Sequence, residues 1–493
     1  MNAQISTLTR RCEETETRIQ EHRKLLSAVR WLPMEILREI FLATVDFPPR
    51  MYQSMYKMWF LDSSPMTSLW DIELVSKGWR RALLSYARIW SHVIIRDASL
   101  FDRGYREVIR LGRQLQRAQN HPLSIFIHQP QDGAVVSSHL IVSLIPFASK
   151  IQTMHLSVSH ASVPRFHPLS SFLVSLHSLS ILSTDISVTP HLVFPNPFEN
   201  TFRDAENLQR LELLDAYARI HQLSIPWRAI KHLKIINRLE VQFHHYTAFE
   251  DILEVLNIAT TIEDLELQIS LLSPVSPGIT SPSTAPSLRS LKLSTSINHF
   301  GNFSALLDRL DMPSLSQLVV ECADSTHGHT MPNQDIMRSF LGLLERSECL
   351  LTSLTLYDVR MTSYDMRSLF IRLPTLEELH LANVGNDTIT NTILRKPTAI
   401  DKTPPAFPKL HTLHINGAWG FEPANFIKMV KSRCASADGY AQLRSVSVAW
   451  KAGVPDTLGD IEDRAHIVAS ELKDCDTDGL ELSSFVYWSI GSR

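Results

Sequence analysis

One spacing of apolar residues recurs along this chain after about residue 150. An apolar residue is followed by two other residues, a second apolar residue, one other residue and a third apolar residue, as in Leu208, Leu211 and Leu213. Eleven such units begin at Ile151, Leu176, Leu208, Ile230, Ile262, Leu288, Leu315, Leu351, Leu376, Leu410 and Leu443. Because side chains alternate between the two faces of a strand, this spacing predicts short strands with one buried face.

The units start about 22 to 36 residues apart, and a repeat of this length is typical of a solenoid. Segments with helical spacing of apolar residues, such as 249–257, 303–310 and 336–344, lie between consecutive units. We therefore predict an α/β solenoid in which stacked strands share one continuous core. A helix at 459–472 and a last strand at 480–490 are expected to cover its open end.

Several units are preceded by a proline two residues earlier, at Pro286, Pro313, Pro374 and Pro408. Together with the apolar spacing, this pattern resembles an irregular leucine-rich repeat array. It departs from that family in its uneven period and in lacking the Asn or Cys that usually follows the third Leu. The resemblance places the repeat domain at 97–493. Its first elements are expected to be a helix at 100–120, a strand at 121–127 and a helix at 139–148.

The N-terminal segment, residues 1–30, predicts a separate helix. Ile5, Cys12, Ile19 and Leu26 lie seven residues apart, as they would in a short coiled coil. A single solvated helix packed on the next module is favoured over this, because Thr15 and His22 fall in the same seam.

Residues 31–96 contain small helical pieces with apolar edges. The first is Leu32-Pro33 followed by Glu35, Ile36 and Leu37, and then Ile40 and Phe41. The later pieces carry Val75, Trp79, Arg80 and Trp90. In this order they resemble an F-box, which implies a small all-α module. Two departures are Ser76, where the family often has Cys, and an insert at about 47–67. The part of the insert from Tyr52 to Leu69 is expected to be a loop or a short helix.

Proteins that pair an F-box with leucine-rich repeats include large fungal F-box-like families. The resemblance implies a substrate-recognition subunit of a cullin-RING (SCF-type) ubiquitin ligase, which docks on a Skp-type adaptor and through it on a cullin. The adaptor-binding residues would be Leu32, Pro33, Ile36, Leu37, Val75 and Trp79. For Ile40, Phe41 and Trp90 a core position is favoured. The alternative is a non-catalytic repeat scaffold whose first helices only cap the solenoid.

The substrate would lie on the outward strand positions, which are the third, fifth and seventh residues of each unit. We predict a substrate-binding surface formed by Arg210, Glu212, His232, Lys234, Asp264, Glu266, Lys292, Glu378, His380 and His414. The signs are mixed, so the sequence indicates no single charge class of ligand.

Composition limits the other classes of function. The formal net charge is -3, so there is no basic footprint for nucleic acid. Residues 1–30 are polar and no apolar run is long enough to span a membrane. The five cysteines are scattered, which favours free thiols in a reducing compartment, cytoplasmic or nuclear.

No motif for catalysis, cofactor or metal binding is present, so we expect no enzyme activity and no cofactor. The segment 474–479 copies the start of a calcium loop, but Phe485 stands where the bidentate Glu is needed. His327 and His329 are expected to be solvated. A Ser- and Pro-rich stretch at 271–285 is expected to be a spacer, and phosphorylation of Ser273, Ser276 and Ser281 is an alternative.

Overall fold

The computed structural model describes residues 2–25, 32–44, 47, 51–53, 59–61, 69–102, 104–129, 135–184, 200–214, 220, 223–236, 249–268, 283–296, 300–323, 334–385, 388–398, 405–417, 420–434, 440–451, 458–473 and 480–487. The chain divides into two compact units, Met1–Leu176 and His177–Arg493. The expected boundary at residue 96/97 therefore lies inside the first unit.

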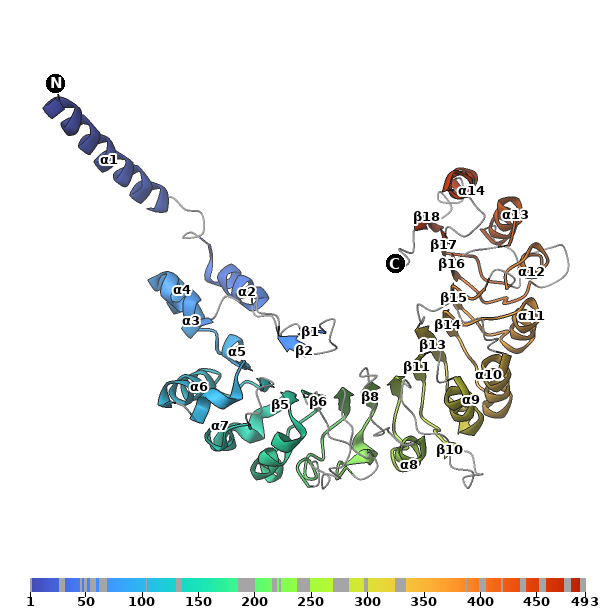
Figure 1. Cartoon of the computed structure of the whole chain (residues 1–493), viewed down its shortest axis with the longest axis horizontal. Coiled ribbons are helices and arrows are strands. Elements are labelled where there is room, and N and C mark those ends of the chain that lie inside the picture. The colour runs from blue at the N-terminus through green and yellow to red at the C-terminus, as the bar shows by residue number, and fades with distance from the viewer. Residues whose placement is uncertain are drawn as a thin grey trace. The chain divides into compact units, whose positions relative to one another are not determined.

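The first unit begins with helices and continues into a parallel sheet (Figure 1). Its helices are α1 (Asn2–Leu25), α2 (Met34–Thr44), α3 (Leu69–Val75), α4 (Lys77–Leu84), α5 (Ala87–Trp90), α6 (Tyr105–Arg117) and α7 (Ser138–Leu144), with 3-10 helices at Ala98–Asp102, Ile145–Lys150 and His160–Phe172. Strands β3 (His92–Ile95), β4 (Leu123–His128) and β5 (Ile151–Val158) pair in parallel in that order. The sheet thus begins at β3, within the segment that was expected to be all-α.

The insert after α2 differs from its prediction. Among its described residues, β1 (Met51–Gln53) and β2 (Trp59–Leu61) pair antiparallel, where the sequence favoured a loop or a short helix. Aromatic residues such as Tyr52, Trp59 and Phe60 favour extended backbone, which accounts for the difference.

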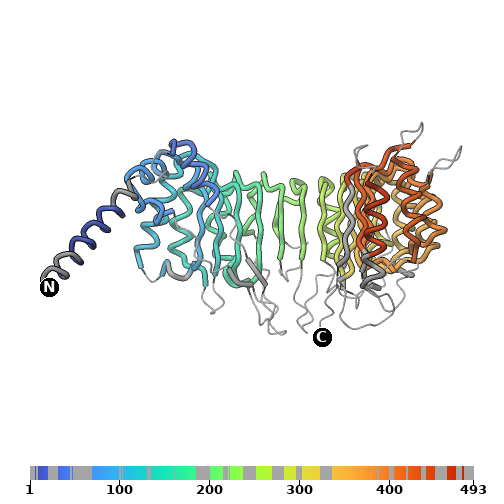
Figure 2. The backbone as a smooth tube through the Cα atoms, turned by 90° about the horizontal axis from the view of Figure 1, so that it is seen from above, coloured from blue at the N-terminus to red at the C-terminus, as the bar shows by residue number. Residues whose placement is uncertain are grey.

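The second unit is an α/β solenoid, as predicted. Its strands pair in parallel in the order β6 (Ser178–Ser183), β7 (Arg210–Leu214), β8 (His232–Ile236), β9 (Asp264–Gln268), β11 (Ser290–Ser296), β13 (Gln317–Ala323), β14 (Ser353–Tyr357), β15 (Glu378–Ala382), β16 (Thr412–Gly417), β17 (Ser445–Lys451) and β18 (Glu481–Tyr487). In the green to yellow part of Figure 2, the strands of this unit can be seen running side by side. A second, two-stranded sheet joins β10 (Ser283–Thr284) to β12 (Leu310–Asp311).

Helices lie on one side of this sheet (Figure 1). They are α8 (Phe249–Ile258), α9 (Phe300–Arg309), α10 (Gln334–Ser347), α11 (Ser363–Arg372), α12 (Asn391–Leu394), α13 (Pro423–Cys434) and α14 (Leu458–Glu471), with a 3-10 helix at Trp227–Ala229.

The three apolar positions of each unit form the core, as the pattern predicted. In the unit that leads into β11, Leu288, Leu291 and Leu293 are all fully buried. Equivalent residues are in register across neighbouring strands, as Leu291 is with Leu265 and Leu318. The predicted closing elements are also present, since α14 packs on β17 and β18.

Candidate functional site

The helices of the F-box-like segment pack around two aromatic side chains. Phe41 on α2 and Trp79 on α4 lie with ring centroids 5.1 Å apart, and Phe41 is fully buried. Trp90 on α5 is also fully buried, and its indole N–H donates to the carbonyl of Leu83 at 2.9 Å. Phe41 and Trp90 therefore occupy the core positions expected for them.

Ser76, the residue that departs from the family pattern, begins helix α4. Its hydroxyl accepts a hydrogen bond from the backbone N–H of Trp79 at 3.1 Å. A serine in this position satisfies one of the free N–H groups of the first turn and typically contributes about 1 kcal/mol. The departure from Cys is thus compatible with a well-formed helix.

Large apolar side chains are exposed on α2, α3 and α4. Helices α2 and α3 both pack on α4. We call this group the exposed apolar set; it comprises Ile36 (47% exposed), Ile40 (40%), Leu74 (83%), Val75 (60%) and Leu84 (42%). Exposed apolar residues on neighbouring elements are typical of a protein interaction surface.

The predicted adaptor residues fall into two groups. Pro33, Ile36 and Val75 are exposed, and Leu32 is partly exposed. Leu37 is buried at 5% exposure, and Trp79 is half-buried against Phe41. These two would support the contact from behind.

The sequence misplaced or missed three members of the exposed apolar set. Ile40 was expected in the core but is exposed, because Leu37 and Phe41, one turn apart, already provide the buried stripe of α2. Leu74 and Leu84 were not singled out. The sequence did indicate that Leu74 is exposed. It is adjacent to Val75 at the end of a short helix, and a single buried face of a helix cannot cover two adjacent residues.

An ion-pair and stacking cluster joins these helices to α6. Arg117 on α6 contacts the carboxylate of Glu73 on α3 through both terminal nitrogens, at 2.7 and 3.3 Å. The same guanidinium lies over the rings of Trp70 and Trp90, at 4.8 and 4.4 Å from their centroids. Arg80 adds a more exposed contact to Glu73 at 3.2 Å. The cluster therefore ties the F-box-like helices to the helix that follows β3.

The predicted substrate residues lie on the strand face of the second unit, in rows set by the pairing register. Glu212, Lys234, Glu266 and Lys292 are direct neighbours on β7, β8, β9 and β11. Arg210, His232 and Asp264 form a second row. Glu378, His380 and His414 lie further along, on β15 and β16. The sequence thus chose residues that the structure brings onto one surface, but as two separated groups.

Charges in the first group are paired with one another. Lys234 lies 2.9 Å from Glu266, and Lys292 lies 3.6 Å from Glu266 and 3.2 Å from Glu321. His232 contacts Asp264 at 2.5 Å. Opposite charges on neighbouring strands stabilise the pairing, so part of this charge pattern serves the sheet itself.

The second group centres on two stacked imidazoles. The rings of His380 and His414 lie 4.3 Å apart at an angle of 15°. Burial, and then the neighbouring His414, lowers the pKa of His380. Burial also lowers the pKa of His414, while the carboxylates of Glu481 and Glu378 oppose the shift. These shifts favour the neutral form of both rings, in which they do not repel each other.

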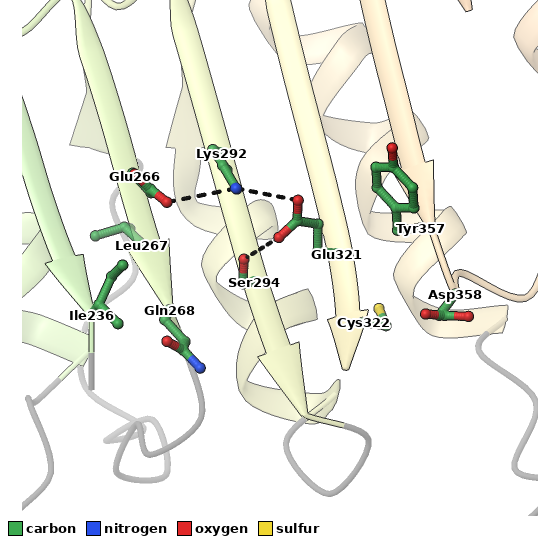
Figure 3. A pocket seen from close by; sticks show the side chains of 10 residues that line it. All are labelled: Ile236, Glu266, Leu267, Gln268, Lys292, Ser294, Glu321, Cys322, Tyr357 and Asp358. Atoms are coloured by element: carbon green, nitrogen blue, oxygen red, sulfur yellow. Dashed lines mark hydrogen bonds and ion pairs between the residues drawn. The ribbon is translucent and has the colours of Figure 1, made fainter. Parts of the chain in front are cut away.

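A groove of about 530 Å³ opens at the ends of β9, β11, β13 and β14 (Figure 3). Among the described residues, the charged side chains that line it are Glu266, Lys292, Glu321 and Asp358, and the exposed ring of Tyr357 stands beside them. Ser294 donates its hydroxyl proton to Glu321 at 3.0 Å. Glu321 and Tyr357 were absent from the predicted set, although each is the seventh residue of its unit, a position that the prediction itself included.

Other candidate chemistry is not supported by the described residues. Within them, no cluster of three or more His, Cys, Asp or Glu could hold a metal ion. Among the described cysteines, Cys12, Cys322 and Cys349 are free thiols. Of the helices described there, none is long and apolar enough to cross a bilayer. The stretch 271–282, His327, His329 and the calcium-like segment 474–479 lie outside the described residues.

Comparison with known proteins finds similarity among solved structures. No protein-family model matches the chain, and no curated protein matches it. Among solved structures, the crystal structure of the Rad7 and Elc1 complex in yeast is matched with 13% identity and a TM-score of 0.29, over 83% of this chain and 93% of that chain. A TM-score of this size does not establish a common fold, so the function is proposed below from this chain's own residues.

Proposed function

We propose that this protein is the substrate-recognition subunit of a cullin-RING (SCF-type) ubiquitin ligase. The helices α2, α3 and α4 dock on a Skp-type adaptor, and the strand face of the second unit holds the substrate protein. The observation that carries the proposal is the exposed apolar set, of which Leu74 and Val75 are 83% and 60% exposed. It occupies the segment whose motif resembles an F-box.

The chemistry of the two surfaces supports this division of roles. Burying apolar side chains such as Ile36 and Val75 against a partner contributes about 25 cal/mol per Å² of apolar surface removed from water. The strand face instead carries hydrogen-bonding and charged groups, which suit selective recognition more than bulk affinity. No catalytic group is assigned to either surface, so the chain would act by binding alone.

One observation favours the alternative, a repeat scaffold in which the F-box-like helices only cap the array. The cluster of Glu73, Arg117, Trp70 and Trp90 anchors these helices to α6, as a cap would require. A cap does not, however, account for the apolar side chains that remain exposed on α2 and α3.

Adaptor pull-down with purified full-length protein tests the proposal. Ile36→Glu with Val75→Glu should abolish binding, and Leu32→Ala with Pro33→Ala should do the same. Ile371→Glu, at an apolar side chain on α11 that is 81% exposed, is the matched control and should bind as the wild type does. Point variants are preferable to deleting residues 1–96, which would also remove β3 from the first sheet.

Retention of adaptor binding by both double variants would refute the proposed docking surface. Absence of binding by the wild-type chain would select the scaffold alternative.

A further inference from the structure

The two units of the chain carry opposite net charges. Met1–Leu176 contains 21 Lys and Arg residues against 14 Asp and Glu residues, a net charge of +7 with the histidines neutral. His177–Arg493 contains 27 Lys and Arg residues against 37 Asp and Glu residues, a net charge of -10. Because these counts include every residue of the chain, the positive excess of the first unit does not depend on how its side chains pair. A basic unit in a chain of net charge -3 indicates an anionic partner.

The positive charge of the first unit is concentrated between α4 and α6. Residues 76–117 contain ten Lys and Arg residues and three Asp and Glu residues. The basic side chains described as exposed in this segment are Lys77, Arg80, Arg81, Arg88, Arg96, Arg106, Arg110 and Arg113. Two nearby carboxylates are already engaged, since Glu73 contacts Arg80 and Arg117, and Asp102 contacts His139.

Helix α6 presents four arginines along one face. They are spaced by four, three and four residues, which places them in a single stripe: Arg106, Arg110, Arg113 and Arg117. Arg106 and Arg113 are exposed, and neither has an ion-pair partner among the residues that the structure describes. The one acidic residue of α6, Glu107, is half-buried and points away from Tyr105, because residues two apart on a helix do not face each other.

An apolar edge runs beside the arginine stripe. The side chain of Tyr105 is 84% exposed and that of Ile109 is 52% exposed. These residues are four apart, so they are neighbours on the helix surface. The core contacts of α6 are made by Leu111 and Leu115, which lie away from this edge. The exposed face of α6 therefore offers apolar contact and positive charge side by side.

This combination favours an acidic protein helix over a nucleic acid. A polyanion would gain little from Ile109 and would be repelled by the net charge of -10 on the second unit. An amphipathic helix lying beside α6 would instead present an apolar side chain to Tyr105 and Ile109 and carboxylates to the arginines.

The spacing of the arginines fits such a helix. Arg106 and Arg113 are seven residues apart, about 10 Å along the helix axis. Two carboxylates seven residues apart on a neighbouring helix have the same separation, so both arginines would be matched together. Each guanidinium can bind a carboxylate through two parallel hydrogen bonds.

We propose that the exposed face of α6 binds an acidic amphipathic helix of a partner protein. Arg106 and Arg113 contact its carboxylates, and Tyr105 and Ile109 contact an apolar side chain between them. This face is distinct from the exposed apolar set on α2, α3 and α4 and from the strand face of the second unit. The proposal therefore goes beyond the ligase role and does not depend on it.

Fluorescence anisotropy with the full chain tests the inference. The probe is a fluorescein-labelled, alanine-based peptide of about 20 residues, long enough to form a helix, with Glu at a spacing of seven and Leu at a spacing of four on the same face. A second peptide carries Gln in place of Glu, and a third carries Leu on the opposite face. The Glu peptide should bind, and each of the other two should lose about tenfold or more in affinity. Added salt should weaken the Glu peptide, because salt screens exposed charges.

Variants then locate the binding on α6. Arg106→Glu with Arg113→Glu should weaken the Glu peptide about tenfold or more. Arg106→Lys with Arg113→Lys keeps the charge and should stay within about threefold of the wild type. Tyr105→Gln with Ile109→Gln should weaken binding about fivefold or more, because it removes the apolar contact and leaves the charge unchanged.

The matched control reverses two exposed arginines of the second unit. Arg338→Glu with Arg367→Glu, on α10 and α11, makes the same change in net charge and should bind as the wild type does. Backbone amides of β3 and β4 that exchange as slowly as in the wild type would show that the α6 variants are folded.

Equal binding of the Glu and Gln peptides, or no binding of either, would overturn the inference. So would a control variant that weakens binding as much as the α6 variants do, because the attraction would then be a general effect of net charge. Tighter binding of duplex DNA, unchanged by Tyr105→Gln with Ile109→Gln, would overturn it in favour of a nucleic-acid site.

Adaptor binding, measured separately by pull-down, should be retained by the α6 variants. Its loss in these variants would assign α6 to the adaptor contact and overturn a separate site. Absence of adaptor binding by the wild type, with peptide binding retained, would refute the ligase role and leave the α6 site standing.

Discussion

The pair formed by Glu73 and Arg117 is expected to contribute most of the coupling between α3 and α6. The Glu73 side chain is 9% exposed and the Arg117 side chain 23%, and they share a two-point contact at 2.7 and 3.3 Å. Glu73→Gln would leave a largely buried guanidinium without its counter-charge. Hydrogen bonds to charged groups are worth about 1.5–3 kcal/mol, so we expect a loss of about 2–3 kcal/mol in stability.

Arg117→Met should cost more than Glu73→Gln. It removes the same two hydrogen bonds and also the stacking on Trp70 and Trp90, which adds about 0.5–2 kcal/mol. In a double-mutant cycle the two changes should show a coupling energy of about 1.5–3 kcal/mol. Arg80→Met is the control, because the Arg80 side chain is 61% exposed and its contact with Glu73 should contribute less than about 1 kcal/mol.

The assay should report on the first unit alone, because a single melting temperature would mix it with the second. Hydrogen exchange followed by mass spectrometry on peptides from β3, β4 and α6 gives the free energy of opening locally. A coupling energy below about 0.5 kcal/mol would refute the cluster's role. So would an Arg80→Met variant that is as unstable as Arg117→Met.

Two further predictions concern the second unit. Arg433 is fully buried and donates to the carbonyls of Phe407, Leu410 and Ala441, at 3.3, 2.9 and 3.0 Å. Arg433→Met should therefore lower the free energy of opening around β16 and β17 by about 2–4 kcal/mol, measured by hydrogen exchange, and wild-type protection there would contradict this. Burial lowers the pKa of His380 and His414 below the ordinary value of 6.5, so the unfolded chain takes up protons at a higher pH than the folded chain. The stability that the two neutral histidines contribute is fully present above pH 6.5 and is lost as the pH falls below it. The free energy of unfolding, measured between about pH 7.5 and 5, should depend less on pH in the His380→Gln, His414→Gln double variant than in the wild type. An equal dependence on pH in the two proteins would rule out the stacked pair as the cause.

The strand array could be predicted because its signal is local and repeated. Each unit carries its own buried triplet, such as Leu376, Leu379 and Leu381, and the length of a repeat fixes which triplets become neighbours. The strand β3 could not be predicted in the same way. His92 to Ile95 offers only four residues of pattern, and its strand conformation depends on pairing with β4, about thirty residues further along the chain.

Charged contacts across the strand face could not be predicted from a single repeat unit, because they depend on how neighbouring strands are aligned. Alternation alone placed Glu212, Lys234, Glu266 and Lys292 on the same face of the sheet, where they are direct neighbours. Which positions meet was not predictable: Glu321 reaches Lys292 and Tyr357 only because β13 is aligned residue by residue with β11 and β14. A ligand site that takes one residue from each of several strands therefore cannot be recognised from the sequence pattern of one unit.

The same reasoning separates the two kinds of surface in this chain. On α2, exposure of Ile36 and Ile40 arises because a short helix buries only Leu37 and Phe41, and this can be seen on a helical projection. On the strand face Arg210 is exposed, whereas Ser180 and Ala382, at other outward positions, are buried, so alternation alone does not identify an accessible surface. There, opposite charges on neighbouring strands pair with one another, as Lys234 does with Glu266 and Lys292 does with Glu321. A binding site on such a face is therefore to be sought where the charges of neighbouring strands fail to cancel.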